Sequence, residues 1–341
     1  MKTNTSTIKE IAYQLGLSTS TVSRALRGLS QIKPETRAAV VRVAEELDYQ
    51  PNMLAKSLAK SHTKTIGLVV PSLNYYFFSS VLQSIEETAL QAGYSVMICQ
   101  TGESYLREVS QIQNLLNSKV EGFIISLSRD TSQYEHIERL VRKKIPVVLF
   151  DRYIEGLEAS KVIVDNQLAA FQATEHLIEN GCKRLGFLAG PPNLLISNQR
   201  VEGFKAALQQ HQLPFQKRYV LHSDFSQENT MMQTFNLMNL PDAPDGLLVM
   251  SDRIAFAAMH ALKQRGLRIP ADVAVVSFNN EPTCDYLTPS LTSVSQPIQD
   301  MGREAVRLLL KQLDTDNLLP ETTILPTQLV VRGSSIRSEV G

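Results

Sequence analysis

The sequence predicts an α/β protein preceded by a small, all-helical N-terminal region. Within residues 7–27, apolar residues recur at helical spacing on either side of one glycine, which is typical of two short helices. From Thr65 onward, short apolar strands alternate with helical stretches, the pattern of parallel sheets covered on both faces. The length of 341 residues allows a head of about 60 residues and two α/β lobes of about 130 each.

The first two predicted helices form a helix-turn-helix. Gly16 supplies the turn between them, and Ser18 can cap the second helix by accepting a bond from a backbone N–H. The positions expected to turn inward are Ile8, Ile11, Ala12, Leu15, Val22, Ala25 and Leu26. A third helix is expected within residues 32–49, with Pro34 and Glu35 in its first turn. Any amphipathic helical hairpin could show the same stripe, so the interpretation also depends on the neighbouring segments.

The outward face of the second helix carries groups that suit DNA. Its side chains are short hydroxyls and one guanidinium, which can enter a major groove and form hydrogen bonds with base edges. The candidate DNA contacts of this region are Thr7, Ser18, Thr19, Ser20, Thr21, Ser23 and Arg24.

The charge of the chain is unevenly distributed. Through Lys64 the sequence holds ten basic and five acidic residues, and the whole chain holds 34 of each. The N-terminal part therefore carries a surplus of five positive charges and the remainder a surplus of five negative ones. A basic segment of this kind can face phosphates, although most basic helical faces are simply solvated.

A short linker follows the third helix. Residues 54–59 are good helix formers, but so short a helix is marginal in water because nucleation is costly. We expect it to become ordered only on DNA. The alternative is a flexible polar connector.

The remaining elements are predicted from apolar runs and helical periodicity. The expected strands lie within 66–72, 94–100, 120–127, 145–152, 161–166, 184–190, near 219, and within 246–252, 273–280 and 291–297. The expected helices cover 79–91, stretches beginning at 105 and at 133, then 168–179, 198–211, 227–238 and 254–264.

Residues that follow the strands are the candidate ligand contacts, because ligands of such sheets bind beyond the carboxyl ends of the strands. These positions hold aromatic rings, carboxylates, one arginine and amides, which suit a hydroxyl-rich ligand. Structural alternatives exist: Phe77 can be a core residue, and Asp151, Asp165 and Asp252 can cap the segments after them.

Two segments make the chain resemble a known family. They read TIKEIAYQLGLSTSTVSRALR, residues 7–27, and QPNMLAKSLAKSHTKTIGL, residues 50–68. The second contains the pattern Pro-Asn-x-x-Ala-(Arg/Lys)-Ser-Leu. Together with the domain order over essentially the whole chain, they resemble the lactose-repressor (LacI/GalR) family of bacterial transcription regulators.

The resemblance implies a domain plan. It implies a DNA-binding head over residues 1–50, a hinge helix and linker over 51–63, and a two-lobed core like that of periplasmic binding proteins over 64–341. The N-terminal lobe would comprise about 64–165 and 297–323, and the C-terminal lobe about 166–296 and 324–341.

The resemblance also implies how DNA is bound. In a homodimer, two hinge helices would pair in the minor groove of a pseudo-palindromic, double-stranded DNA operator, with Leu58 as the apolar wedge. Lys56 stands where relatives often carry Arg. The implied hinge contacts are Asn52, Ala55, Lys56 and Leu58.

The resemblance further implies a small, sugar-like effector. It assigns to the effector pocket Phe77, Phe78, Asp151, Ile196, Arg200, Phe225, Asp252 and Asn279. Arg200 lies in the segment QRVEGF, which matches the family's ligand-binding arginine. Relatives usually carry Asp at the position of Asn279, so one negative charge is missing and an anionic ligand is less disfavoured.

The sequence lacks the motifs that are typical of several other classes of protein. No GxGxxG follows the first strand, and GxxxxGK[ST], HExxH and paired CxxC motifs are missing. We therefore expect no enzymatic activity, cofactor or metal. Three cysteines, no apolar leader and no run of 18 apolar residues predict a cytoplasmic protein without a membrane span. The end of the chain lacks leucine heptads, which favours a dimer over a tetramer.

The leading hypothesis is an effector-controlled DNA-binding regulator, most simply a repressor. A solute-binding protein of a transporter would share the two lobes, but a signal peptide would replace the head. A sugar-processing α/β enzyme would need a phosphate-binding loop or a catalytic acid/base pair.

Overall fold

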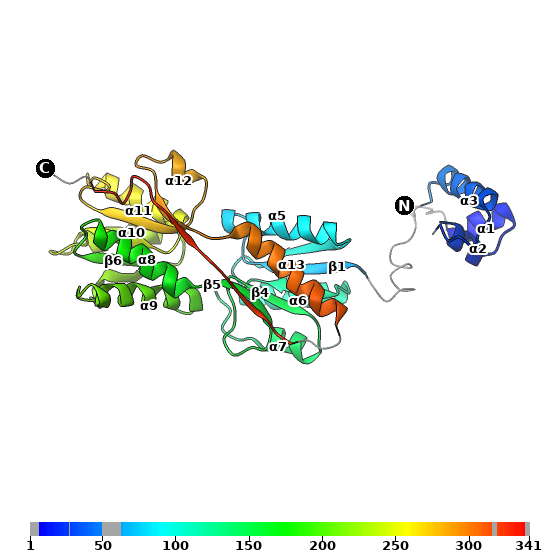
Figure 1. Cartoon of the computed structure of the whole chain (residues 1–341), viewed down its shortest axis with the longest axis horizontal. Coiled ribbons are helices and arrows are strands. Elements are labelled where there is room, and N and C mark those ends of the chain that lie inside the picture. Colours follow the sequence, from blue (N-terminus) through cyan, green and yellow to red (C-terminus); the bar gives the residue numbers. More distant parts are fainter. Residues whose placement is uncertain (1–6, 27, 50–62, 316–318, 338–341) are drawn as a thin grey trace. The chain divides into compact units, whose positions relative to one another are not determined.

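The computed structural model describes residues 7–26, 28–49, 63–315 and 319–337. The chain separates into two compact units, residues 1–63 and 64–341, and the elements of both are labelled in Figure 1.

The first unit is a three-helix head. It contains α1 (Ile8–Leu15), α2 (Thr19–Leu26) and α3 (Pro34–Glu46). Their common core holds the fully buried side chains of Ile11, Val22 and Val40, and small alanines allow the helices to pack closely. Gly16 ends α1 in the left-handed region, with a φ of 61°, so the predicted turn is confirmed.

The second unit is built on two six-stranded sheets. The first sheet has the order β11-β5-β4-β3-β1-β2 and the second has the order β12-β10-β9-β8-β6-β7. All neighbouring strands are parallel except β10 and β12. The two lobes thus have nearly the same topology, and the two predicted lobes with parallel sheets are confirmed.

The first sheet is covered by helices on both faces. Its strands are β1 (Thr65–Val70), β2 (Ser95–Gln100), β3 (Gly122–Ile125), β4 (Val147–Phe150), β5 (Ser160–Val164) and β11 (Thr322–Leu325). Leu68 packs toward α5 (Tyr76–Gln91) and α13 (Ile298–Asp314), whereas Val69 packs toward α6 (Tyr105–Asn117) and α7 (Glu135–Arg142). Successive residues of a strand point to opposite faces, so a continuous apolar run fills both layers.

The second sheet has one continuous core. Its strands are β6 (Leu185–Ala189), β7 (Val220–His222), β8 (Gly246–Val249), β9 (Ala274–Asn279), β10 (Thr292–Ser295) and β12 (Gln328–Val330). The remaining elements are α8 (Asn166–Glu179), α9 (Leu195–Gln210), the 3₁₀ turn Lys217–Tyr219, α10 (Gln227–Met238), α11 (Asp252–Gln264) and α12 (Thr283–Tyr286). Asp165 caps α8 by accepting the backbone N–H of Leu168 at 2.8 Å, so that predicted cap is confirmed.

Three segments join the two lobes. They connect β5 to α8, β10 to α13 and β11 to β12, and the last runs from lobe to lobe in Figure 1. β11 continues to Leu325 in the first sheet, so the expected crossing after residue 323 falls two residues too early.

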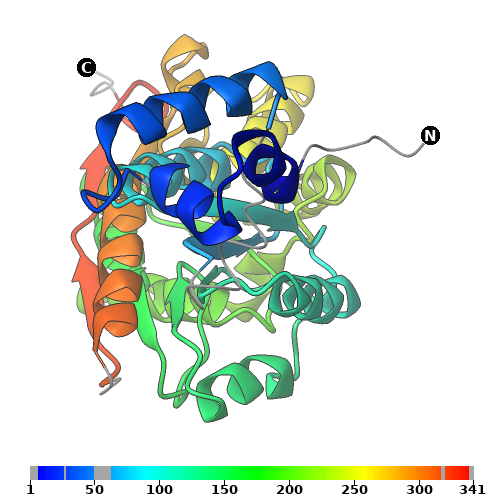
Figure 2. The same cartoon turned by 90° about the vertical axis from the view of Figure 1, so that its right-hand side faces the viewer.

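Figure 2 shows the same chain turned by 90°. Within the described residues, no helix is long and apolar enough to cross a membrane.

Candidate functional site

The outward face of α2 agrees with the sequence prediction at three of the four residues expected there, and Ser23 is the exception. Thr19, Ser20 and Arg24 are exposed, whereas Thr21 and Ser23 are half-buried. Exposure follows from helical spacing, since Val22 and Ala25 turn the opposite face into the core of the head. Arg24 is therefore exposed on the same helix as the two exposed hydroxyls.

Two of the predicted DNA contacts have structural tasks as well. The Oγ of Ser18 accepts the backbone N–H of Thr21 at 3.1 Å and lies 2.8 Å from the Thr21 Oγ1, so it caps α2. The backbone N–H of Thr7 donates to Glu10 Oε2 at 2.7 Å at the start of α1. The predicted hinge contacts Asn52, Ala55, Lys56 and Leu58 lie outside the described residues.

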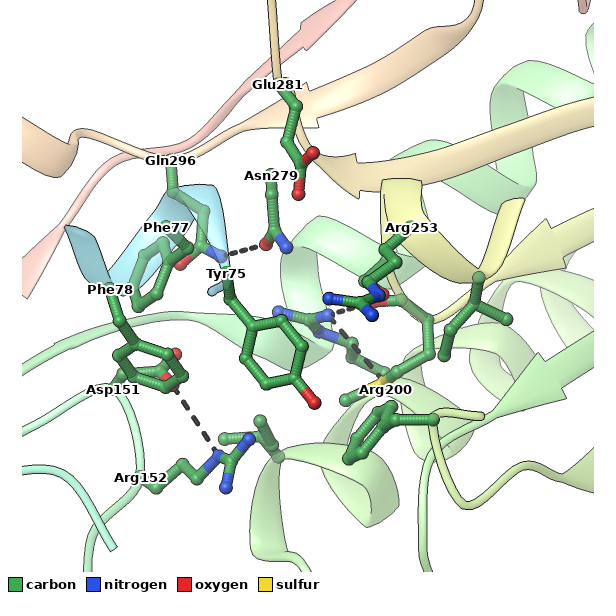
Figure 3. Close-up of a pocket in the computed structure, with 15 residues that line it drawn as sticks. Tyr75, Phe77, Phe78, Asp151, Arg152, Arg200, Arg253, Asn279, Glu281 and Gln296 are labelled. Atoms are coloured by element: carbon green, nitrogen blue, oxygen red, sulfur yellow. Dashed lines mark hydrogen bonds and ion pairs between the residues drawn. The ribbon is translucent and has the colours of Figure 1, made fainter. Parts of the chain in front are cut away.

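A cavity lies between the two lobes of the second unit, and Figure 3 shows its lining. It has about 600 Å³ of empty space, its open mouth included. The residues that line it, which we call the effector cavity, are Tyr75, Phe77, Phe78, Asp151, Arg152, Ile196, Arg200, Phe225, Met250, Ser251, Arg253, Ile254, Asn279, Glu281 and Gln296. Seven of the eight predicted effector contacts are among them.

Arg200 lies in the second turn of α9 and is buried, with only 3% of its surface exposed. Its Nε donates to Asn166 Oδ1 at 2.9 Å and its Nη1 donates to the Met250 carbonyl at 2.7 Å. The guanidinium also lies 4.0 Å from the centroid of the Phe278 ring. Burial lowers the pKa of Arg200 to about 10, so the side chain is still a cation at neutral pH. These contacts fix the position of the Arg200 guanidinium before any ligand binds.

Asp151 faces Arg200 from the other lobe. It follows β4 in the left-handed region, with a φ of 57°, and only 7% of it is exposed. Burial raises the pKa of its carboxyl, while the charges of Arg152 and Arg200 oppose that rise. The cavity therefore offers a cationic donor and a carboxyl acceptor, which together suit the hydroxyl groups of a polyol.

Arg152 is the neighbour of Asp151 and also follows β4, where the sequence places candidate ligand contacts, but it is not among the effector contacts that the family resemblance implies. Its Nη1 and Nη2 donate to Glu103 at 2.7 and 3.1 Å, and Nη1 also donates to the Leu127 carbonyl at 3.1 Å. Its Nε lies 3.9 Å from Asp151 Oδ2 and has no hydrogen-bond partner among the described residues. The guanidinium is therefore fixed beneath the cavity.

The aromatic side chains of the cavity also belong to the core. Phe77 and Phe78 are 4% and 3% exposed, and their ring centroids are 5.2 Å apart in an edge-to-face arrangement. Phe77 is therefore a core residue that also lines the cavity. Phe225 follows β7 with a φ of 69°, and its ring lies 5.9 Å from the Arg152 guanidinium.

Asp252 is the predicted effector contact that does not line the cavity. Its carboxylate is fully buried and accepts the hydroxyls of Ser277 and Ser293 and, at 2.7 Å, the backbone N–H of Glu281. Because Asp252 is the first residue of α11, its side chain turns back between β9 and β10. It fixes the loop after β9 and does not reach the cavity.

The loop after β9 brings in a carboxyl that the sequence analysis missed. Asn279 and Asn280 have φ values of 104° and 52°, and this turn places Glu281 on the cavity wall beside Asn279. Burial and the nearby Asp252 raise the pKa of Glu281 to about 7. Asn279 Oδ1 accepts a bond from Gln296 Nε2 at 2.7 Å. Glu281 thus partly supplies the negative charge that an aspartate at position 279 would carry.

Tyr75 and Arg253 meet across the mouth of the cavity. The Arg253 guanidinium lies 5.1 Å from the centroid of the Tyr75 ring. Arg253 is exposed, and within the described part of the chain its guanidinium forms no salt bridge. The search for a metal site covers all described residues. Among them, no cluster of His, Cys, Asp and Glu is suited to hold a metal ion.

Comparisons with known proteins agree with this architecture. The family described as "Bacterial regulatory proteins, lacI family" matches residues 7–52, and the family described as "Periplasmic binding protein-like domain" matches residues 174–335. Catabolite control protein A of Priestia megaterium is 30% identical over 330 residues, 96% of this chain and 99% of that protein. The ribose operon repressor of Halalkalibacterium halodurans is 34% identical over 326 residues, 96% of each chain.

A solved structure shows the same arrangement of elements. The crystal structure of the lac repressor dimer bound to operator and the anti-inducer ONPF is similar with a TM-score of 0.88 at 26% identity. The similarity covers 98% of this chain and all of that one. With its helix-turn-helix, its two-lobed core and relatives matched over nearly their whole length, the chain belongs to the LacI family of bacterial regulatory proteins.

Proposed function

We propose that this LacI-family regulator represses transcription as a homodimer on a pseudo-palindromic DNA operator and that a small, sugar-like effector controls its operator affinity. The observation that carries the proposal is the cavity in which Arg200 and Asp151 face each other from different lobes. A ligand that bridges them favours one arrangement of the lobes over another. Such a preference is what allosteric control requires.

DNA recognition is assigned to two parts of the chain. Thr19, Ser20 and Arg24 of α2 would contact base edges, and the paired hinge segments with Leu58 would enter the minor groove. The head and the hinge then act as one DNA-binding module over residues 1–63, and the core over residues 64–341 acts as the sensor.

The effector is inferred to be a sugar or sugar derivative. Phe77, Phe78 and Phe225 provide apolar ring faces, while Arg200 and Asp151 provide a donor fork and an acceptor. The name of the ribose operon repressor refers to a sugar operon. Arg253 at the mouth adds a cation, so sugar acids and sugar phosphates belong among the candidates together with neutral sugars.

We further infer that the protein works in the cytoplasm and is not an enzyme. The cavity holds Asp151 and Glu281 as its only carboxyls among the described lining residues, and they are assigned to ligand binding. A transport receptor and a sugar-processing enzyme are the alternatives to be tested.

The test is a mobility-shift assay of the full chain with the DNA upstream of its own gene, with and without a panel of sugars. A specific shift that one sugar abolishes or strengthens supports the proposal. Arg24→Ala should weaken the specific shift and Arg200→Ala should remove only the response to the sugar. Sugar binding without any specific DNA shift would favour the transport receptor, and conversion of the sugar would favour the enzyme.

A further inference from the structure

The chain enters its second unit at Lys64, directly before β1. In the order of the first sheet, β1 lies between β3 and β2. Tyr94 directly precedes β2, and Glu121 directly precedes β3. Because these strands are parallel, the three residues lie at the amino ends of three neighbouring strands. The linker therefore meets the core in the middle of this edge of the sheet.

Lys64 is bonded to both sides of this edge. Its backbone N–H donates to Glu121 Oε1 at 2.6 Å, and its carbonyl accepts the backbone N–H of Ser95 in β2 at 2.9 Å. Its Nζ donates to the Tyr94 hydroxyl at 3.0 Å and lies 4.2 Å from the centroid of the Tyr94 ring. The hydrogen bond with Tyr94 raises the pKa of Lys64, so the ammonium group stays charged at neutral pH.

Tyr94 is a firm support for the lysine side chain. The tyrosine is buried and packs in the core layer beneath α5 and α13. Lys64 itself is exposed. An exposed lysine ordinarily has much rotamer freedom, and ordering it costs conformational entropy. Here the exposed side chain is ordered on a buried ring, which indicates that the position of Lys64 is fixed relative to the first lobe.

The backbone of Lys64 is unusual as well. Its φ is 49°, in the left-handed region that residues with a Cβ rarely adopt. Lys119 and Lys144 have φ values of 58° and 56°, but they follow the ends of α6 and α7, where this conformation is common. Lys64 directly precedes a strand instead. Such a conformation persists only where the surrounding contacts hold it, and it sets the direction in which the chain leaves β1.

We propose that Lys64 is a positioning residue for operator binding, which fixes the direction in which the linker leaves the first lobe. In a dimer, two fixed exits hold the two linkers, and with them the two heads, at one preferred separation. The half-sites of the operator must match that separation, because joined modules bind best when their connection spans the two sites without strain. The inference rests on the proposed function and adds the residue that sets the spacing of the half-sites.

The test measures how strictly the full chain requires one spacing. The wild-type chain selects its operator from random double-stranded DNA, and one base pair is then added to or removed from the centre of that operator. Either change moves the half-sites by about 3.4 Å and rotates one about the helix axis. In a mobility-shift titration, the affinity of the wild type should fall about tenfold or more with each change.

Lys64→Gly is the main variant. Glycine adopts the left-handed conformation without strain, but it removes the bond to Tyr94 and leaves the backbone free to adopt other conformations. The linker can then leave the lobe in several directions. The loss of affinity on a change of spacing should therefore shrink to about threefold or less.

Three further variants make the result specific. Lys64→Arg keeps a cation beside Tyr94 and should retain the spacing preference. Tyr94→Phe keeps the ring and removes the hydroxyl, so it should relax the preference in part, and it also serves if Lys64→Gly does not fold. The matched control is Lys144→Gly, the same substitution at an exposed, left-handed lysine of the same lobe, which should show the wild-type preference.

The spacing preference is a ratio of two affinities of one protein, so a smaller folded fraction alone does not change it. If Lys64→Gly and Tyr94→Phe keep the full preference, or if Lys144→Gly relaxes it as much as Lys64→Gly does, the inference is overturned. A wild type that selects an operator but tolerates both changes of spacing also overturns it, and the proposed function stands. If the wild type selects no DNA sequence, the proposed function fails and the inference fails with it.

Discussion

Glu103 and Arg152 form a buried, bidentate ion pair beneath the effector cavity, with oxygen–nitrogen distances of 2.7 and 3.1 Å. Glu103 Oε2 also accepts the backbone N–H of Arg129 at 2.6 Å, and Arg129 contacts Asp224 of the other lobe. The pair therefore connects the wall of the cavity to a contact between the lobes.

Removal of Glu103 should destabilise the core. Glu103→Ala leaves the Arg152 guanidinium buried without its anion, and loss of one partner of a buried pair typically costs about 3–5 kcal/mol. Urea denaturation should show this as a lower midpoint with an unchanged slope. The matched control is Glu135→Ala, because Glu135 pairs with Arg139 at 3.2 Å on an exposed helix face and such pairs contribute about 0.3–0.5 kcal/mol. Equal losses of unfolding free energy in the two variants would show that the buried pair contributes no more to stability than the exposed pair.

Glu281 should make the stability of the core depend on pH. Burial and Asp252 raise the pKa of Glu281 from 4.5 to about 7, and Arg253 opposes the rise. Between these values the folded state binds the proton more tightly than the unfolded chain, so the contribution of Glu281 to stability falls as pH rises from about 4.5 to 7. Glu281→Gln should remove this part of the pH dependence. Urea midpoints measured at pH 5, 6, 7 and 8 test it, and parallel curves for the two proteins would exclude the effect.

The sequence predicted the two-lobed fold because the apolar runs of its strands and the periodicity of its helices are local properties. It did not indicate α13, β11 or β12 as separate elements. β11 and β12 are short strands with exposed and half-buried residues. They become strands by pairing with β5 and β10, which lie far away in the sequence.

The site was predictable where a side chain lies at the carboxyl end of a strand. Asp151 directly follows β4 and Asn279 is the last residue of β9, and both line the cavity. Asp252 is at an equivalent position, but the first turn of α11 directs its carboxylate to Ser277 and Ser293. Glu281 reaches the wall only through two successive residues with positive φ, a conformation that local sequence patterns do not reveal.

Arg24 should determine the base preference at one position of each half-site. Arg24 carries the guanidinium on the exposed face of α2, and this group can donate hydrogen bonds to O6 and N7 of a guanine. Arg24→Ala should cost about 1–3 kcal/mol of specific binding and relax the preference at one base pair. Footprinting on single-base operator variants measures this. The control is Arg42→Ala on α3, whose effect should be uniform across sequences; unchanged discrimination by Arg24→Ala would remove Arg24 from base recognition.

Arg200 should be required for the effector response and not for DNA binding. Its Nε and Nη1 are fixed by Asn166 and Met250, and its charge survives burial because its pKa stays at about 10. Hydrogen bonds to charged groups contribute about 1.5–3 kcal/mol, so Arg200→Lys, which keeps the cation and removes the fork, should weaken effector binding by roughly 10–150-fold.

The comparison variant is Arg253→Ala, which removes an exposed cation from the mouth of the same cavity. Its effect on a neutral sugar should be small, and its effect on a sugar acid should be larger and should decrease with added salt. Calorimetry measures both affinities, and a mobility shift without effector verifies that each variant still binds the operator. Because Arg200 is buried in the core unit and Arg24 lies in the head, the two losses should be independent when Arg200→Lys and Arg24→Ala are combined. Loss of operator binding in Arg200→Lys, or an unchanged affinity for the effector, would contradict this division of tasks.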